Sequence, residues 1–548
     1  MSSSKKKQLR KEQYMTERQN TAAQEAKKLR GYTLTFFIVI ALVLSIFVAA
    51  IAINPVKNVV YKNTDAITVG DYTLSSADVN YYYIDTVTNY VNQNSTYISL
   101  IIDVTKPLNE QVVNEETGAT WADTFMESAK QSIKSTYALY DMAVKAGHQM
   151  TDSQKQSIDS TISTYQLYAA YYGHNNLTAY LRAMYGPGAS EESYRNYLEV
   201  SAMANSYLSA HSESLEFSAE DLINFQKDAP YKYNSYTFAT YYMNANTFLS
   251  GGTTDDKGNT TYTDEEKATA LKAAENAANL LAGGTYSDVA AFDMAIKELP
   301  VNQDKTNVSS TKHEDVLFRE MTTIFQDWMI GKVETEDEDA EPTFEIRKEG
   351  DVTVIPYTTG TGDSAVVNGY YVVRYEGVNT NEFAMKNVRH LLVKFEGGKT
   401  DSTTGVTSYT EQEQAAAKEE AEGILADWIA AGDLSEESFA ELAKKHSDDN
   451  AEAGGLYEDI YPGQMVTAFE DWCYDAERKV GDYGIVKTEY GYHIMFFVGD
   501  SETTFRDFML TNALRNEEMD KWHAELTADI ELTVLTIKHV EMDLILNH

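Results

Sequence analysis

One block of sequence is written twice in this chain, and that repetition constrains its fold more than any other feature. Residues 230–378 and 387–499 share five blocks in the same order. The pairs are NSYTFATYY with NVRHLLVKF, TYTDEEKATALKAAE with SYTEQEQAAAKEEAE, IFQDWM with AFEDWC, RKEGDVTVI with RKVGDYGIV, and NGYYVVRY with YGYHIMFF. Five matches in one order indicate a duplication. Each copy is therefore predicted to form its own domain.

The second copy reads as an α+β arrangement. Its apolar periodicity predicts strands at 387–394, 484–487 and 491–498, long helices at 410–430 and 435–446, and a short helix at 465–476. The first long helix of each copy begins with a capping box, formed by Thr263 with Glu266 and by Thr410 with Glu413. The same start signal at the same place supports one fold for both copies.

Two histidines lie inside the apolar strands of the second copy, His390 in VRHLL and His493 in GYHI. Between them come an HSDD turn at 446–449, a glycine pair at 454–455 and the segment GQMVTAFED at 463–471. A single histidine in a strand is usually a satisfied core residue. Two histidines with this order of parts between them favour a site, and the order resembles the parvulin family of peptidyl-prolyl isomerases.

The resemblance implies a site that needs neither a cofactor nor a metal. Such sites twist an X-Pro amide by holding the proline ring and by stabilising the less polar transition state with fixed groups. By position, the resemblance assigns the catalytic groups to His390, Asp449, Thr488 and His493. It places Thr488 where a hydroxyl orients the second histidine. Asp449 either orients a histidine or acts on the substrate carbonyl.

The substrate-binding positions of the family fall on Met465, Phe469 and Tyr457. Met465 and Phe469 are four residues apart on a short helix, so they suit both a proline pocket and an ordinary core. The family commonly has GGDLG, whereas this chain has GGLYEDI at 454–460. Tyr457 thus replaces a leucine wall, which leaves the shape of the pocket and the preferred residue before proline open.

The first copy lacks both histidines. Our alignment of the strands places Tyr236 opposite His390 and Tyr371 opposite His493, while Phe325 keeps the position of Phe469. The first copy is therefore predicted to be a degenerate parvulin-like domain that folds but does not catalyse. Because inactive parvulin repeats accompany active ones in SurA-like chaperones, the resemblance implies a binding or spacer role.

The N-terminus predicts a membrane anchor. Residues 1–30 contain nine Lys or Arg against three Glu, and 32–53 form an uncharged apolar run of 22 residues, enough to span a bilayer core of ~30 Å. The basic tail, 1–31, should stay in the cytoplasm and the body should lie outside the cell membrane. A signal peptide cleaved after Ala50-Ile51-Ala52 is the alternative, but the run exceeds the usual h-region of ~7–15 residues.

The net charge and the cysteine content restrict the partners and the location that the chain can have. Without residues 1–30 the chain keeps 36 Lys or Arg against 81 Asp or Glu, a net charge near −45. That balance argues against a nucleic-acid-binding role, which requires basic faces. Cys473 is the only cysteine, so no intrachain disulfide forms, and an exported protein without disulfides suggests a Gram-positive surface. The acidic insert at 334–341 reads as a solvated loop rather than a calcium site.

Residues 64–229 read as mostly helical after a short strand and turn at Ile67, Val69 and Gly70-Asp71. Their many tyrosines suit a lining for unfolded clients, but ordinary helix packing is the favoured interpretation. A strand and turn before a helical region resembles the chaperone part of SurA- and PrsA-type foldases. In that resemblance, a helix and strand in 504–548 return to the same chaperone domain.

Together these features predict a multidomain extracytoplasmic foldase: a single transmembrane helix, a mostly α-helical SurA-like chaperone domain and two α+β parvulin-like domains. Its partners would be unfolded or newly exported polypeptides with X-Pro bonds. The alternative from another class is a non-catalytic holdase or surface binding scaffold that uses the parvulin folds for contact only. A secreted substrate-binding or adhesion protein is a weaker third possibility.

Overall fold

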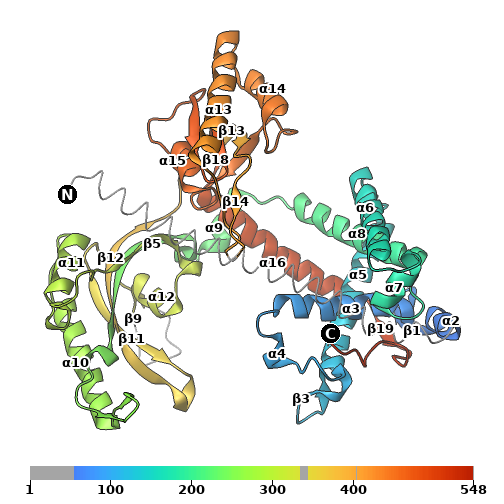
Figure 1. The fold of residues 1–548 in the computed structure, drawn as a ribbon, viewed down its shortest axis with the longest axis horizontal. Coiled ribbons are helices and arrows are strands. Elements are labelled where there is room, and N and C mark those ends of the chain that lie inside the picture. The colour runs from blue at the N-terminus through green and yellow to red at the C-terminus, as the bar shows by residue number, and fades with distance from the viewer. Residues whose placement is uncertain (1–54, 334–342, 403, 547–548) are drawn as a thin grey trace. The chain divides into compact units, whose positions relative to one another are not determined.

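The computed structural model describes residues 55–333, 343–402 and 404–546 (Figure 1). The predicted basic tail and membrane anchor, and the acidic insert at 334–341, lie outside these residues. Within the described ranges, no helix has both the length and the apolar character needed to cross a membrane. The chain forms two compact units. Unit 1 comprises the described parts of Met1–Glu216, Phe395–Ala416 and Arg515–His548, and unit 2 those of Phe217–Lys394 and Ala417–Leu514.

Unit 1 joins the two ends of the described chain in one antiparallel sheet. Strand β1 (Asp65–Val69) lies between β2 (Tyr72–Ser75) and β19 (Leu532–Val534). Gly70 has a φ of +52°, which suits the tight turn from β1 to β2. Residues 532–534 pair directly with 67–69, so the C-terminal strand lies beside the first strand of the described chain.

Helices make up most of unit 1. They are α2 (Pro55–Asn63), α3 (Ser76–Gln93), α4 (Ile98–Ile101), α5 (Trp121–Lys145), α6 (Asp152–Tyr171), α7 (Leu177–Tyr185) and α8 (Glu191–Ser214). A small hairpin, β3 (Val112–Asn114) and β4 (Ala119–Thr120), precedes α5. Ser75 caps α3 in a reciprocal capping box with Asp78, which satisfies two backbone donors that the helix start would otherwise leave free.

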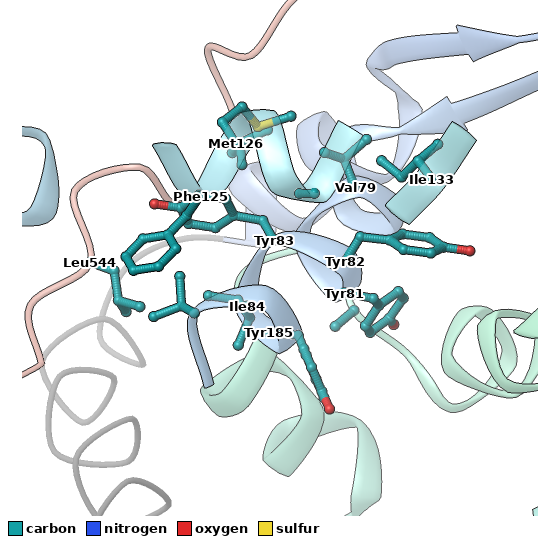
Figure 2. Packing of buried hydrophobic residues seen from close by; sticks show 14 of the residues in the cluster. Val79, Tyr81, Tyr82, Tyr83, Ile84, Phe125, Met126, Ile133, Tyr185 and Leu544 are labelled. Atoms are coloured by element: carbon teal, nitrogen blue, oxygen red, sulfur yellow. The ribbon is translucent and has the colours of Figure 1, made fainter. Parts of the chain in front are cut away.

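The tyrosines of unit 1 are mostly core residues. Tyr81, Tyr82 and Tyr83 of α3 are buried beside apolar side chains of α5 such as Phe125, Met126 and Ile133 (Figure 2). Leu544 from the C-terminal segment joins the same cluster. Tyr171 is an exception, with 82% of its surface exposed. The packing interpretation of the tyrosine-rich helices is therefore right for most of them.

Unit 2 contains two four-stranded antiparallel sheets, one from each copy of the repeat. The first sheet has the order β11-β12-β5-β8 and the second the order β16-β13-β18-β17. Their strands are β5 (Ser235–Asn244), β8 (Thr311–Leu317), β11 (Val352–Thr359), β12 (Val366–Asn379), β13 (Ala384–Lys394), β16 (Leu456–Ile460), β17 (Tyr483–Lys487) and β18 (Gly491–Thr504). Read in reverse, the second order is β17-β18-β13-β16, and its strands correspond one by one to β11, β12, β5 and β8 of the first sheet. The duplication therefore extends to the topology.

The helices of the two copies correspond as well. The first copy has α10 (Asp264–Ala282), α11 (Val289–Glu298) and α12 (Thr323–Met329), and the second has α13 (Glu411–Ala431), α14 (Glu436–His446) and α15 (Thr467–Cys473). In the first copy, the apolar cluster on one sheet face includes α10 and α11 side chains, and the cluster on the other face includes those of α12. Two further helices, α9 (Ala219–Gln226) and α16 (Phe505–Asp529), flank the copies in sequence.

The strand register corrects one sequence-based alignment. Tyr371 pairs with Tyr242 in the first sheet, and His493 pairs with Leu392 in the second. His390 lies two residues before Leu392, so its counterpart is Thr240 and not Tyr236. The prediction for Tyr236 is wrong because a shift by an even number of residues leaves the same face inward, and the alternating apolar pattern is therefore blind to it. The correspondence of Tyr371 with His493 is supported separately, because Tyr371 pairs with Ile355 of β11 as His493 pairs with Val486 of β17, the matched last residues of RKEGDVTVI and RKVGDYGIV.

Candidate functional site

The two histidines of the second copy meet on one face of its sheet. His390 lies on β13 and His493 on the adjacent strand β18. Because Leu392 is paired with His493, the two histidines are diagonal neighbours whose side chains point to the same face. Their ring centroids are 5.2 Å apart, and their exposed fractions are only 1% and 5%.

A chain of hydrogen bonds runs through both rings. Thr488 Oγ1 lies 2.9 Å from His493 Nε2, and His493 Nδ1 lies 3.1 Å from His390 Nδ1. The backbone N–H of Tyr490 donates to Thr488 Oγ1, which leaves the hydroxyl proton available for His493 Nε2. In that arrangement His493 donates from Nδ1 to His390 Nδ1, and the proton of His390 is on Nε2.

The opposite order of protons is less favourable. It would place a bare Nε2 lone pair of His390 in front of the Asp449 carboxylate, whose Oδ2 lies 3.6 Å away. Two facing acceptors repel each other, whereas an N–H directed at a carboxylate is attracted to it. The geometry therefore favours one tautomer for each ring: Nδ1–H on His493 and Nε2–H on His390.

Both rings are held neutral. Burial lowers the pKa of His390 to about 4, although the Asp449 carboxylate acts in the opposite direction. Burial also lowers the pKa of His493 to about 3, and the neighbouring His390 adds to that effect. An unperturbed histidine titrates near 6.5. The pair therefore remains uncharged across the neutral pH range, as hydrogen-bonding groups rather than as cations.

Asp449 is positioned by the turn that follows α14. Ser447 Oγ accepts a hydrogen bond from the Leu392 backbone N–H at 3.1 Å, and the Asp448 N–H donates to the Leu392 carbonyl at 2.9 Å. The turn is thereby fixed to β13 at Leu392, two residues beyond His390. Ser447 is thus a supporting residue of the site that the sequence analysis missed.

The glycine pair brings an edge strand against the site. The carbonyl of Gly455 accepts a hydrogen bond from the His390 N–H at 2.9 Å. Its φ is +69°, and a Cβ at this position would lie 2.0 Å from the His390 carbonyl oxygen. Only glycine combines this backbone conformation with so close an approach. The pair thus marks where the chain enters β16.

Tyr457 comes from β16, a strand that the sequence analysis did not predict. Its hydroxyl donates to Asp449 Oδ2 at 3.2 Å, and its ring lies 4.8 Å from the ring of His390. Burial and the Asp449 carboxylate both raise the pKa of Tyr457 above its ordinary value. Tyr457 is therefore not only a wall of the site; its hydroxyl also shares the carboxylate with His390.

Phe469 of α15 provides an aromatic surface beneath both imidazoles. Its ring is perpendicular to each, with centroid distances of 5.2 Å to His390 and 5.4 Å to His493. Half-buried Met465 packs against the same cluster, and Cys473 is buried within it. All seven residues singled out from the sequence, from His390 to His493, thus come from one sheet face and the segments that border it.

The arrangement is suited to hydrogen bonding at the edge of an apolar surface. It has two neutral imidazoles, one carboxylate and one phenol beside a phenylalanine. In the part of the chain that the structure describes, no group of three or more His, Cys, Asp or Glu side chains is placed to hold a metal ion. The groups present can bind an apolar ring and donate to or accept from a carbonyl next to it.

Comparisons with known proteins agree with this geometry. The family model of the PPIC-type PPIase domain matches residues 370–501. "Foldase protein PrsA 1" of Listeria monocytogenes serotype 4b is 43% identical over 68 residues, which cover 12% of this chain and 23% of that protein. "Foldase protein PrsA 2" of Listeria monocytogenes serovar 1/2a is 44% identical over 61 residues, or 11% and 21% of the two chains.

Solved structures give further matches. PrsA from Bacillus cereus is 25% identical over 29% of this chain and 55% of that one, with a TM-score of 0.17. The peptidyl-prolyl isomerase ESS1 from Candida albicans is 25% identical over 21% and 63%, with a TM-score of 0.16. The chain spans less than a quarter of the length of the curated relatives it matches. The resemblance to parvulin-type isomerases and to PrsA is confirmed by the family match and the local identity.

Proposed function

We propose that this chain is an extracytoplasmic foldase that isomerises X-Pro bonds in exported polypeptides. The observation that carries the proposal is the hydrogen-bonded pair of His390 and His493 lying edge-on to Phe469, inside the region that matches the PPIC-type PPIase domain. The reaction relieves a real kinetic obstacle, because an unaided X-Pro bond flips over tens to hundreds of seconds.

The proposed mechanism uses only groups already in place. Rotation about the peptide bond meets a barrier of ~18–20 kcal/mol that comes from amide resonance. Phe469 and Met465 hold the proline ring, and the buried imidazoles keep water away from the amide. As the amide twists, its charge separation falls, and a site of low polarity favours that state. Thr488 fixes the ring orientation of His493, and Asp449 with Tyr457 fixes that of His390.

The domain limits belong to the same proposal. Residues 387–499 form the catalytic parvulin domain, 230–378 a parvulin-like domain without the histidine pair, and 64–229 with 504–548 the chaperone domain. Unit 1 has a surface suited to holding unfolded chains near α4 and the β3–β4 hairpin. Large apolar side chains there are exposed, namely Tyr97, Leu100, Ile101, Val112 and Val113. Single exposed apolar residues are ordinary, but five close in sequence favour a contact surface.

The proposed location is the outer face of a cell membrane. The apolar run at 32–53 would be the anchor, with the basic residues before it in the cytoplasm. The strong negative charge of the body would attract cationic client segments and oppose self-association. Protease added to intact cells tests this topology, since it should digest the body and spare residues 1–31. Full protection of the body would mean that the orientation is wrong.

The alternative is a holdase whose second copy binds without catalysing. One observation favours it: the Tyr457 hydroxyl engages Asp449, which occupies a carboxylate oxygen that a substrate would otherwise meet. The intact order of Thr488, His493 and His390 opposes it, because a mere contact surface has no need of a fixed tautomer.

The experiment that separates the two is NMR exchange spectroscopy on an X-Pro peptide with the full-length chain in detergent. Catalysis predicts faster cis–trans exchange, a large loss in His493→Ala and Phe469→Ala, and none in His446→Ala. His446 ends α14 with an exposed side chain and serves as the matched control. Equal exchange rates with wild type and His493→Ala would contradict catalysis at this site and support the holdase alternative.

A further inference from the structure

We infer that the first copy carries a second binding site for proline-containing extended segments, one that holds its ligand without isomerising it. The site is the face of the first sheet that bears α12. It is built from Phe325, Met321, Tyr371, Tyr242 and Tyr357. The inference rests on the proposed function, because the occupant is argued from the equivalent site in the second copy.

The aromatic floor of the catalytic site is preserved in the first copy. Phe325 of α12 lies with its ring perpendicular to Tyr371, at a centroid distance of 5.2 Å and an interplanar angle of 89°. The equivalent pair, Phe469 and His493, has 5.4 Å and 85°. Met321 precedes Phe325 by four residues, as Met465 precedes Phe469, and it packs in the same cluster. The first copy therefore keeps the aromatic surface that would hold a proline ring, although it lacks the two histidines.

The groups that could run the reaction are replaced. Thr240 stands in the position of His390, as the strand register shows. His313 of β8 pairs with Phe238, just as Tyr457 pairs with Val388, so it takes the position of Tyr457. His313 Nε2 lies 3.0 Å from Thr240 Oγ1, and its ring stacks on Phe238 at 4.4 Å. One imidazole at the edge strand cannot form the paired arrangement of the second copy.

Tyrosines add a wall that the second copy does not have. Tyr242 lies 4.9 Å from Tyr371 and 5.5 Å from Tyr357, and Tyr357 lies 5.8 Å from Tyr371, measured between ring centroids. All three tyrosines are half-buried, so each keeps part of its surface exposed. Glycine at position 369, paired with Tyr357, leaves space for the Tyr242 ring, whose Cε2 lies 3.0 Å from where a Cβ would stand.

A proline-containing extended segment is the occupant that this chemistry fits. Surfaces lined by aromatic rings recognise such segments because the ring of proline packs flat on them and the extended chain is already ordered. Tyrosine offers a large apolar face together with a hydroxyl that can reach a backbone carbonyl. The same client that presents an X-Pro bond to the second copy can thus be retained by the first, which raises its effective concentration.

Photo-cross-linking tests the inference on the full-length chain in detergent. The probe is a short peptide with one photo-leucine–proline bond, and its twin has alanine in place of proline. Cross-linked residues are mapped by mass spectrometry at sub-saturating peptide. We expect products in both copies with the proline peptide. Tyr371→Ala should reduce the yield in the first copy about ten-fold, equivalent to ~1.4 kcal/mol of binding, and leave the second copy unchanged.

Tyr370→Ala is the matched control, because Tyr370 packs against the cluster of α10 and α11 on the opposite face. Its first-copy yield should stay near wild type, and Tyr371→Phe should retain most of the binding. Hydrogen exchange in β5 and β12 monitors folding of every variant. Products confined to the second copy, or equal yields with the alanine twin, would overturn the inference. First-copy products without X-Pro exchange activity would support the inference and remove the proposed function of the second copy.

Discussion

The Nδ1 atoms of His390 and His493 face each other at 3.1 Å, so a hydrogen bond between them requires that one and only one carries a proton. This single proton links the Thr488 end of the site to the Asp449 end. A change at either end therefore alters what the other presents to a bound amide. The site behaves as one ordered unit, which makes several of its members testable one at a time.

Thr488→Val should slow X-Pro exchange about five-fold, while Thr488→Ser should stay near wild type. Valine keeps the shape but removes the hydroxyl that orients His493 Nε2, and a buried hydrogen bond of this kind contributes about 1 kcal/mol. NMR exchange rates measured for both variants provide the check. A Ser variant as slow as the Val variant would show that the threonine methyl group, and not the hydroxyl, matters.

The exchange rate should be flat from pH 8 to about 5 and fall only at lower pH. The lowered pKa of His390, about 4, and of His493, about 3, keep both rings neutral over that range. A decline centred near pH 6.5 would instead indicate an ordinary exposed histidine. NMR exchange measurements on the same X-Pro peptide test this pH dependence, with the uncatalysed rate recorded at each pH.

The stability of the second copy should also depend on pH through this histidine pair. Between pH 6.5 and about 4 the unfolded chain binds protons that the buried His390 does not, so the folded state loses stability as the pH falls through this window. The loss amounts to about 3 kcal/mol for a shift of this size. Hydrogen exchange of β13 and β18 peptides measures it. In His390→Gln the acid-dependent loss should shrink, and an unchanged slope would contradict the assignment.

Gly455→Ala should disrupt the site from its edge. The positive φ costs ~1–3 kcal/mol for a residue with a Cβ, and the added carbon would meet the His390 carbonyl. Exchange activity should fall, and protection of β16 should be lost. Gly423→Ala is the control, because Gly423 lies in α13 with open space around it. That change should stabilise the helix by ~0.5–1 kcal/mol and leave catalysis unchanged.

Much of the candidate site could be predicted because its signals are local. His390, Asp449, Thr488, Phe469 and His493 come from short segments whose order is preserved, and the structure brings them together. Helix starts were also predictable, since a Ser or Thr three residues before an acid or amide marks a cap, as at Ser75. Such signals depend on a few neighbouring residues and survive without tertiary information.

The features that sequence reasoning missed depend on which strands pair and in what register, and a single sequence does not show either. Strand β16 has five residues, LYEDI, without clear alternation, and it exists because β13 offers it an edge to pair with. The hydroxyl of Tyr457 therefore could not be placed on Asp449. The alignment of Tyr236 with His390 failed for a related reason: an even slip along β5 preserves the apolar face and changes only the partner. His313 was missed because it reaches its site across strands.

Glu541→Gln should stabilise unit 1 above neutral pH. Burial, together with the Asp543 carboxylate, raises the pKa of Glu541 to about 7, against the opposing effects of Tyr61 and Lys57. The folded state then binds a proton that the unfolded chain releases, so stability falls as the pH rises from about 4.5 through 7. Glutamine removes that dependence, a gain of about 1–3 kcal/mol at pH 8.

Hydrogen exchange of β1 and β19 peptides at pH 6 and pH 8 measures the effect of Glu541→Gln. Glu531→Gln, just before β19, is the comparison that should leave the pH dependence unchanged. Parallel pH dependences in wild type and Glu541→Gln would mean that the carboxyl is not protonated in the folded chain.

Suppression of client aggregation should persist when catalysis is removed. A His390→Ala and His493→Ala double variant should still reduce light scattering of a denatured client, because holding uses apolar surface in unit 1 rather than the imidazoles. Leu100→Ser with Val112→Ser should weaken it, since these side chains are among the most exposed apolar groups there. If only the wild type suppresses scattering, the two activities depend on one site.

The pairing of β1 with β19 has a consequence for the order in which the protein matures. Residues 67–69 and 532–534 are neighbours in the sheet but are separated by nearly the whole body of the chain. Because a polypeptide emerges from its N-terminus, β1 must wait, with one edge unsatisfied, until the last strand has been synthesised. Residues 387–499, the second copy, have all been synthesised before β19 emerges. The pairing of β1 with β19 is therefore a late step, which can only follow synthesis of both copies of the repeat.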